Sequence, residues 1–332
     1  MRSGAVSEGA VRGGASRGGG WRRARVARLA LVAVAAAVAA TGIAACSSAS
    51  ADGGSASGKI VAIGAENEYA DVIGQVGGKY VQSTAIMSNP NTDPHSFEAS
   101  PAVAREVSAA QLVVQNGAGY DSFMNTIESA VPGGGRHVVN VQQLLGLPDS
   151  TPNPHLWYDP ATMPKVADAI AAGLATIQPA HAAYFKANAK AFVASLGPWL
   201  NAVGAFKEAY AGVPVATTEP VADYMLQAAG ADNLTPWTFQ ADIMNGVDPS
   251  PQVLASQKAL FTGHKVKVFL YNQQVTDPLT QSLITLADQN HIPVVGVYET
   301  MPVPGYDYQT WMLTEVRDLQ KAVTDRVSTE HL

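Results

Sequence analysis

The chain has 332 residues, of which 21 are basic and 27 are acidic, and it contains a single cysteine, Cys46. The net charge of −6 argues against a nucleic-acid partner, because binding to phosphates requires an excess of Lys and Arg. One cysteine excludes both a disulfide framework and a metal cluster held by several thiolates.

The first 45 residues have the pattern of an export signal. Residues 1–28 contain seven Arg and one Glu, and an apolar run follows from Leu29 to Ala45. Basic, apolar and small-residue regions in this order are typical of signal peptides. Cys46 comes next and resembles the lipobox cysteine of bacterial lipoproteins, which implies lipidation and attachment to the outer face of the cell membrane. A simple membrane-anchor helix is the alternative, although about 17 residues is the lower limit for spanning a bilayer.

Residues 46–58 are mostly Ser, Ala and Gly, and we expect them to form a flexible tether. Removal of residues 1–45 leaves 14 basic and 26 acidic residues, so the exported part is strongly acidic. This charge mainly supports solubility and weakly favours cations as ligands.

The remaining chain predicts an α/β fold with two parallel-sheet lobes joined by a long helix. Short β-rich runs alternate with helical runs, as is typical of parallel sheets with crossover helices. We expect the first lobe over residues 59–178, the linking helix over 179–211 and the second lobe over 212–332. The predicted strands are Lys59–Ile63, Tyr80–Ile86, Leu112–Gln115, His137–Val141, Val213–Thr217, Val266–Leu270 and Val294–Tyr298.

The linking helix has one interruption in its pattern. Apolar residues fall on one stripe between Pro179 and Ala211, and Pro179 suits the first position of a helix. Gly197-Pro198 lies inside this run. Because an interior proline removes a hydrogen bond and clashes with the preceding turn, we expect the helix to bend or split there.

Four potential metal ligands stand just past predicted strands or in Pro-rich loops: His95, His155, Glu219 and Glu299. Ligands of open parallel sheets bind beyond the carboxyl ends of the strands. Two imidazoles and two carboxylates can complete the shell of a divalent first-row metal without a thiolate. Taken singly, each residue also has an ordinary interpretation, as an exposed turn histidine, a first-turn helix acid or a loop acid.

Four motifs in the same order resemble those of the solute-binding lipoproteins of zinc and manganese ABC transporters. They are Asp93–Pro101, Pro154–Pro160, Thr218–Pro220 with Tyr224, and Tyr298–Met301 with Tyr308 and Met312, and Leu112–Asp121 resembles the strand and turn after the first motif. The resemblance implies a receptor that captures Mn²⁺ or Zn²⁺ between its lobes with the four ligands. It also implies delivery to a membrane permease and its ATPase, and we expect a monomer.

The chain departs from this family at two of the four ligands. Glu219 stands where zinc-type members often have His and manganese-type members have Glu, and Glu299 stands where Asp is common. Asp307 is an alternative fourth ligand by spacing. Two nitrogen and two oxygen donors favour manganese modestly, since zinc prefers nitrogen and sulfur, and bidentate carboxylates could raise the coordination number above four.

Two other classes of function compete with metal capture. A metal-dependent hydrolase needs an open coordination position, and the sequence lacks the His-Glu-x-x-His and Gly-x-Ser-x-Gly motifs. A receptor for an organic ligand would instead line a cleft with the aromatic residues Trp157, Tyr158, Trp237 and Trp311. Metal content separates capture from the organic-ligand receptor, because capture predicts about one ion per chain and the organic-ligand receptor predicts none.

Overall fold

The computed structural model describes residues 58–91, 93–130, 135–302 and 304–332. The predicted signal peptide, Cys46 and nearly all of the predicted tether lie outside these residues, so those predictions remain predictions. Within the described ranges, the helices are too short or too polar to cross a bilayer.

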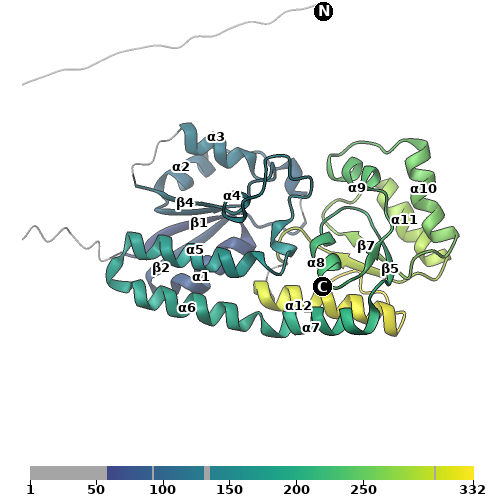
Figure 1. Cartoon of the computed structure of the whole chain (residues 1–332). Coiled ribbons are helices and arrows are strands. Elements are labelled where there is room, and N and C mark those ends of the chain that lie inside the picture. Colours follow the sequence, from purple (N-terminus) through teal and green to yellow (C-terminus); the bar gives the residue numbers. More distant parts are fainter. Residues whose placement is uncertain (1–57, 92, 131–134, 303) are drawn as a thin grey trace, which may run out of the picture. The chain divides into compact units, whose positions relative to one another are not determined.

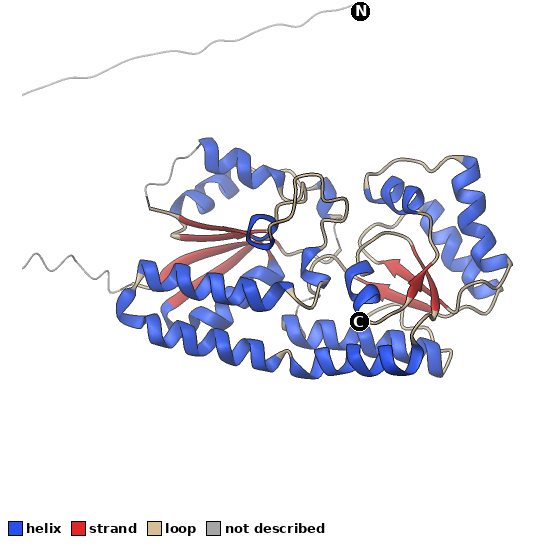
Figure 2. Ribbon diagram, viewed as in Figure 1, coloured by secondary structure: helices blue, strands red, loops and turns tan. Residues whose placement is uncertain are grey.

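Two four-stranded parallel sheets organise the chain (Figures 1 and 2). The first lobe has the strand order β2-β1-β3-β4, and the second lobe has the order β6-β5-β7-β8. The first four strands are β1 Ile60–Glu66, β2 Val81–Met87, β3 Leu112–Gln115 and β4 His137–Asn140. The other four are β5 Pro214–Thr217, β6 Asp232–Asn233, β7 Val268–Asn272 and β8 Val294–Val297. The predicted fold class, with two parallel-sheet α/β lobes, is confirmed.

The two sheets have the same topology when their strands are counted within each lobe. In both, the second strand lies on one side of the first strand and the third strand lies on the other. The chain therefore changes direction across the sheet between β1 and β3, and again between β5 and β7. Such switch points, at the carboxyl ends of the strands, are where open α/β sheets bind their ligands.

Seven of the strands overlap the predicted runs, and most of these are short segments rich in apolar residues. All residues of β3, β7 and β8 are buried, as expected for parallel strands with helices on both faces. The exception is β6, which has two polar residues at the edge of its sheet and carries neither apolar alternation nor β-branched residues. Its sequence gives no strand signal.

Helices cover both faces of each sheet (Figure 2). In the first lobe, α2 and α3 pack with the apolar cluster of Ile63 and Val113, whereas α1 and α5 pack on the opposite face with Ala62 and Val114. This division follows from the alternation of side chains along a strand. The helices of this lobe are α1 Asn67–Gly77, α2 Pro101–Ala109, α3 Ser122–Ala130, α4 Val141–Leu145 and α5 Thr162–Ile177, with 3₁₀ turns η1 Gly78–Tyr80, η2 Pro94–Ser96 and η3 Leu156–Tyr158.

The second lobe is built in the same way. Helices α9, α10 and α11 pack on the face that carries Ala216 and Phe269, and α8 and α12 pack on the other face. The helices are α8 Asp223–Ala228, α9 Trp237–Met244, α10 Pro251–Thr262, α11 Pro278–Gln289 and α12 Tyr308–Thr324. One apolar cluster contains residues of both lobes, so the two lobes share a continuous hydrophobic core.

The predicted linking helix is two helices. After η4 Pro179–His181, α6 Ala182–Ser195 packs against α5 and α1, and α7 Gly197–Tyr210 packs beside α12 (Figure 1). Pro198 lies in the first turn of α7, where its missing N–H has no intrahelical partner to lose. The Gly-Pro pair therefore splits the helix, as its local geometry predicts.

Candidate metal centre

His95 is positioned by the turn that contains it. Asp93 precedes η2, and its Oδ1 accepts a hydrogen bond of 2.8 Å from the backbone N–H of His95. Pro94 fixes the backbone between them. The turn follows β2 and presents a His95 side chain that is only 20 % exposed.

His155 is fully buried, and its tautomer follows from its contacts. The Oδ1 of Asn153 accepts from the backbone N–H of His155 at 3.0 Å and lies 2.8 Å from the Nδ1 of the ring. The Nδ2 of Asn153 donates to the carbonyl oxygen of Pro220 at 2.8 Å, which fixes the orientation of the amide. Because an amide oxygen only accepts, Nδ1 carries the proton and Nε2 presents its lone pair. Burial lowers the pKa of His155, which favours this neutral form.

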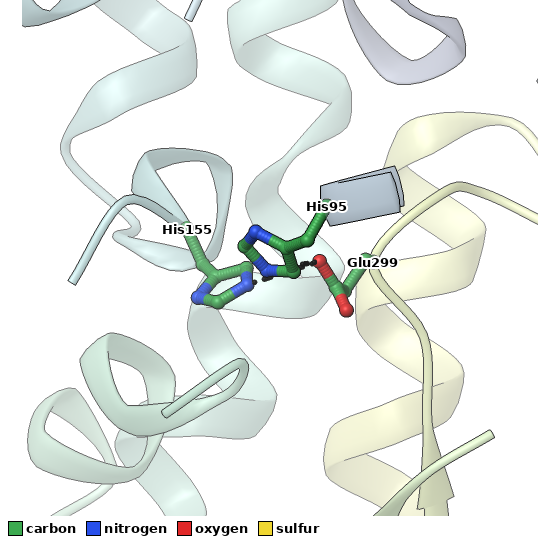
Figure 3. Close-up of side chains that lie close together, drawn as sticks. All are labelled: His95, His155 and Glu299. Atoms are coloured by element: carbon green, nitrogen blue, oxygen red, sulfur yellow. Dashed lines mark hydrogen bonds and ion pairs between the residues drawn. The ribbon is translucent and has the colours of Figure 1, made fainter. Parts of the chain in front are cut away.

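Glu299 follows β8 and meets both imidazoles from the second lobe. Its Oε2 lies 3.1 Å from Nε2 of His95 and 3.2 Å from Nε2 of His155 (Figure 3). The hydroxyl of Tyr120 donates to the same oxygen at 2.9 Å. One ligand atom from each of His95, His155 and Glu299 lies within 4.8 Å of the others. Two ligands of one ion, with bonds of ~2.1 Å at tetrahedral angles, are about 3.4 Å apart, so this spacing suits a shared ion.

The charges around His95, His155 and Glu299 favour a bound cation. Burial opposes charge on His95, but Glu299, Glu219 and Asp93 together raise its pKa to about 9. Burial would raise the pKa of Glu299, yet the two imidazoles outweigh it and the pKa is lowered. A neutral His155 directs its lone pair at the Glu299 carboxylate, and two lone pairs in buried contact repel unless positive charge lies between them. A proton on His95 partly meets this need, and a divalent ion meets it fully.

Glu219 lies beside this group and is linked to it by an amide. The Nδ2 of Asn272 donates to Oε2 of Glu219 at 2.5 Å and to Oε1 of Glu299 at 2.6 Å. The other oxygen of Glu219, Oε1, is buried and has no hydrogen-bond partner among the described residues. Burial and the nearby charge of Glu299 raise the pKa of Glu219. A buried carboxylate with one free oxygen, next to three converging ligands, has the properties of a fourth donor.

Asp307 has a different role from the alternative that its spacing suggested. It is the N-cap of α12, where its Oδ1 accepts a 2.9 Å hydrogen bond from the backbone N–H of Thr310 in a capping box. It is partly exposed, and it is absent from the group that His95, His155 and Glu299 form in the described part of the chain. The structure therefore gives no support to Asp307 as a ligand.

The aromatic residues proposed for an organic-ligand cleft are distributed between core and surface. Trp157, Tyr158 and Trp311 are fully buried, and the Tyr158 and Trp311 rings pack edge to face at 5.7 Å. Trp237 is 43 % exposed, on α9. These four side chains do not line one cavity.

Three residues of the site were missed from the sequence: Tyr120, Asn153 and Asn272. Asn272 ends β7, and its placement at a strand end was the available signal. The predicted strand stopped two residues too early to reveal it. Tyr120 follows β3 in a turn that Asp121 closes, with Oδ2 accepting from the N–H of Asn116 at 2.6 Å.

The first lobe contains two further buried acids. Glu66, at the end of β1, and Glu68, in the first turn of α1, are fully buried, and their carboxylates have no hydrogen-bond partner among the described residues. Burial is the main cause that raises both pKa values. The charge of Glu299 adds to the effect at Glu68, so the first lobe holds a buried carboxyl that responds to the charge of the centre.

Comparison with known proteins identifies the family. Residues 65–322 match the family model described as zinc-uptake complex component A, periplasmic (ZnuA). The chain belongs to this family. Members of the family are metal-binding transport receptors and not enzymes, which confirms the resemblance drawn from the four motifs.

Individual relatives are distant. The manganese-binding lipoprotein MntA of Bacillus subtilis (strain 168) is 26 % identical over 132 residues, which are 38 % of this chain and 43 % of MntA. The match thus spans less than half the length of this curated relative. A crystal structure of ZnuA and the Mn-bound periplasmic metal binding protein from Candidatus Liberibacter asiaticus each have a TM-score of 0.65 at 17 % identity. Each alignment covers 80 % of this chain and 100 % of the other chain, which confirms the fold.

Proposed function

We propose that the chain is the extracytoplasmic substrate-binding component of an ABC importer, and that it captures Mn²⁺ or Zn²⁺ with His95, His155, Glu219 and Glu299. The observation that carries the proposal is the convergence of two imidazole nitrogens, 3.1 and 3.2 Å away, on one buried oxygen of Glu299. Nitrogen and carboxylate donors in this combination suit divalent first-row metals.

The burial of the centre supports capture of the ion as cargo. The side chains of His155 and Glu299 are 0 % exposed, and Glu219 is 2 % exposed. A hydrolytic metal keeps one coordination position open for water or substrate, whereas these donors surround the ion from both lobes. Release of the cargo to a permease then requires the loops that carry the donors to separate.

The proposal extends to the location of the protein. Lipid attached to Cys46 holds the receptor at the outer face of the cell membrane, residues 47–58 form the tether, and a membrane permease with its ATPase receives the ion from a monomeric receptor. The support is the basic, apolar and small-residue pattern that precedes Cys46 and the lipoprotein name of the MntA relative.

Elemental analysis tests the function directly. The chain without residues 1–45 is purified without chelator, loaded with Zn²⁺ or Mn²⁺ and dialysed against metal-free buffer. It is expected to hold one Zn or Mn ion per chain. A double variant, His95→Ala with His155→Ala, is expected to hold none. His331→Ala is the matched control, because His331 is exposed at the C-terminus. Metal-free wild-type protein after loading, or a double variant that still holds one ion, would contradict the proposal.

A further inference from the structure

Asn272 holds the two carboxylates of the centre through a single amide nitrogen. Its Nδ2 carries two hydrogens, and the two acceptors at 2.5 and 2.6 Å are Oε2 of Glu219 and Oε1 of Glu299. Each carboxylate thus has one oxygen bound to this amide and one oxygen that the amide does not contact. The side chain is completely buried, so water does not compete for these hydrogen bonds.

The orientation of this amide is fixed by the backbone. The Oδ1 of Asn272 accepts from the N–H of Gln274 at 3.0 Å, and the backbone N–H of Asn272 donates to Oγ1 of Thr218 at 3.0 Å. A flipped amide would place Oδ1 against both carboxylates and Nδ2 against an N–H group. Both arrangements are repulsive, so Nδ2 must face the carboxylates.

The remaining donor atoms can be counted. Glu219 offers Oε1, which has no hydrogen-bond partner among the described residues. Glu299 offers Oε2, which also accepts from the hydroxyl of Tyr120. With Nε2 of His95 and Nε2 of His155, the centre presents four donors, two nitrogen and two oxygen. Bidentate chelation requires both oxygens of a carboxylate to face the ion, and on both carboxylates the hydrogen bond to Asn272 holds one oxygen toward the amide.

We infer that Asn272 is a specificity-determining positioning residue, which makes Glu219 and Glu299 monodentate and so sets the centre for four-coordinate Zn²⁺ in preference to Mn²⁺. The inference rests on the proposed function and deepens it. Zn²⁺ is almost always tetrahedral in closed protein sites, whereas Mn²⁺ is typical of oxygen-rich octahedral sites. The modest preference for manganese expected from the sequence counted only the types of donor atom, two nitrogen and two oxygen. A coordination number above four would require bidentate carboxylates, which Asn272 disfavours.

The coordination number of the wild-type protein tests this inference without any substitution. The full exported chain is loaded with Co²⁺, whose visible absorption is strong when four-coordinate and weak when six-coordinate, and with Zn²⁺ for X-ray absorption. We expect the strong Co²⁺ spectrum and a Zn²⁺ shell of four nitrogen and oxygen atoms. A six-coordinate spectrum in protein that binds one ion would overturn the inference and leave the proposed function intact. Failure to bind any ion would overturn both.

Substitution tests the residue itself. Asn272→Ala frees the second oxygen of each carboxylate, so the ratio of the Mn²⁺ and Zn²⁺ dissociation constants is expected to fall at least tenfold. Asn233→Ala is the matched control, because its Nδ2 also donates to a carboxylate of the second lobe, Asp223, at 2.8 Å, and Asp223 is not among the proposed ligands. We expect the control to keep the wild-type ratio. An unchanged ratio in Asn272→Ala, or an equal fall in Asn233→Ala, would contradict a specific role for Asn272.

Discussion

Metal binding at neutral pH should release a proton from His95, and this makes the affinity depend on pH over an unusual range. In the metal-free protein, Glu299, Glu219 and Asp93 outweigh burial and raise the pKa of His95 to about 9. An imidazole must be neutral to bind a metal. The proton therefore competes with the metal at every pH below about 9, far above the ordinary histidine range near ~6.5.

The magnitude follows from the pKa. Glu299 stays ionised because its pKa is lowered, and His155 stays neutral because its pKa is lowered too, so His95 dominates the pH dependence from the imidazole side. Each pH unit below the pKa of His95 should weaken the apparent affinity about tenfold, which is on the order of 100-fold at pH 7 relative to pH 9 or above. The raised pKa of Glu219 acts in the same direction.

Calorimetric titration with Zn²⁺ in two buffers of different ionisation enthalpy measures both quantities. We expect release of at least one proton per ion at pH 7, and an affinity that rises with pH until it levels off near pH 9. His95→Gln should release about one proton fewer. An affinity that is flat between pH 7 and pH 9, or proton release that is unchanged in His95→Gln, would refute the reasoning.

Three further predictions concern stability, ligation and anchoring. The metal-free protein should lose stability between about pH 6.5 and 9. The raised pKa of His95 stabilises the folded state fully below the pKa of the unfolded chain, and this stabilisation is lost as the pH rises through the pKa of the folded state. A free energy of unfolding that rises over this range in chemical denaturation would contradict the prediction. Glu299→Ala should abolish metal-induced stabilisation, which is about 2.7 kcal/mol at a hundredfold metal excess over the dissociation constant. Asp307→Ala should keep this stabilisation and lose only about 1 kcal/mol of helix capping. The opposite pattern of thermal shifts would support Asp307 as the ligand. Cys46→Ser should give unprocessed or released protein with unchanged metal binding, and an intact Met1 on wild-type protein in cells, seen by mass spectrometry, would contradict lipidation.

Much of the fold could be predicted because its determinants are local. The buried strands of parallel sheets are short apolar runs, and the pattern of Leu112–Gln115 gave β3 with its observed bounds. Gly197-Pro198 gave the split of the linking helix, since the effect of proline on a helix depends on its immediate neighbours. In contrast, β6 exists because Asp232 and Asn233 pair with Pro214 and Val215, and such tertiary pairing leaves no trace in a two-residue polar segment.

The candidate site shows the same division. His95, His155 and Glu299 could be selected because each stands just past a predicted strand or in a Pro-rich loop, and the structure brings them together. The place of Asn272 at a strand end was the only available signal for it. Its hydrogen bonds to Glu219 and Glu299, which lie 53 and 27 positions away in the sequence, have no sequence pattern. Asp307 has a local role that its sequence also allowed: Asp307 and Thr310 have the spacing of a capping box, which explains the acid without any metal.

Anomalous diffraction from crystals grown with Zn²⁺ tests the central claim most directly. We expect one strong peak per chain, at ~2.0–2.2 Å from Nε2 of His95, Nε2 of His155, Oε2 of Glu299 and Oε1 of Glu219. A peak elsewhere, with these four side chains in their metal-free arrangement, would contradict it.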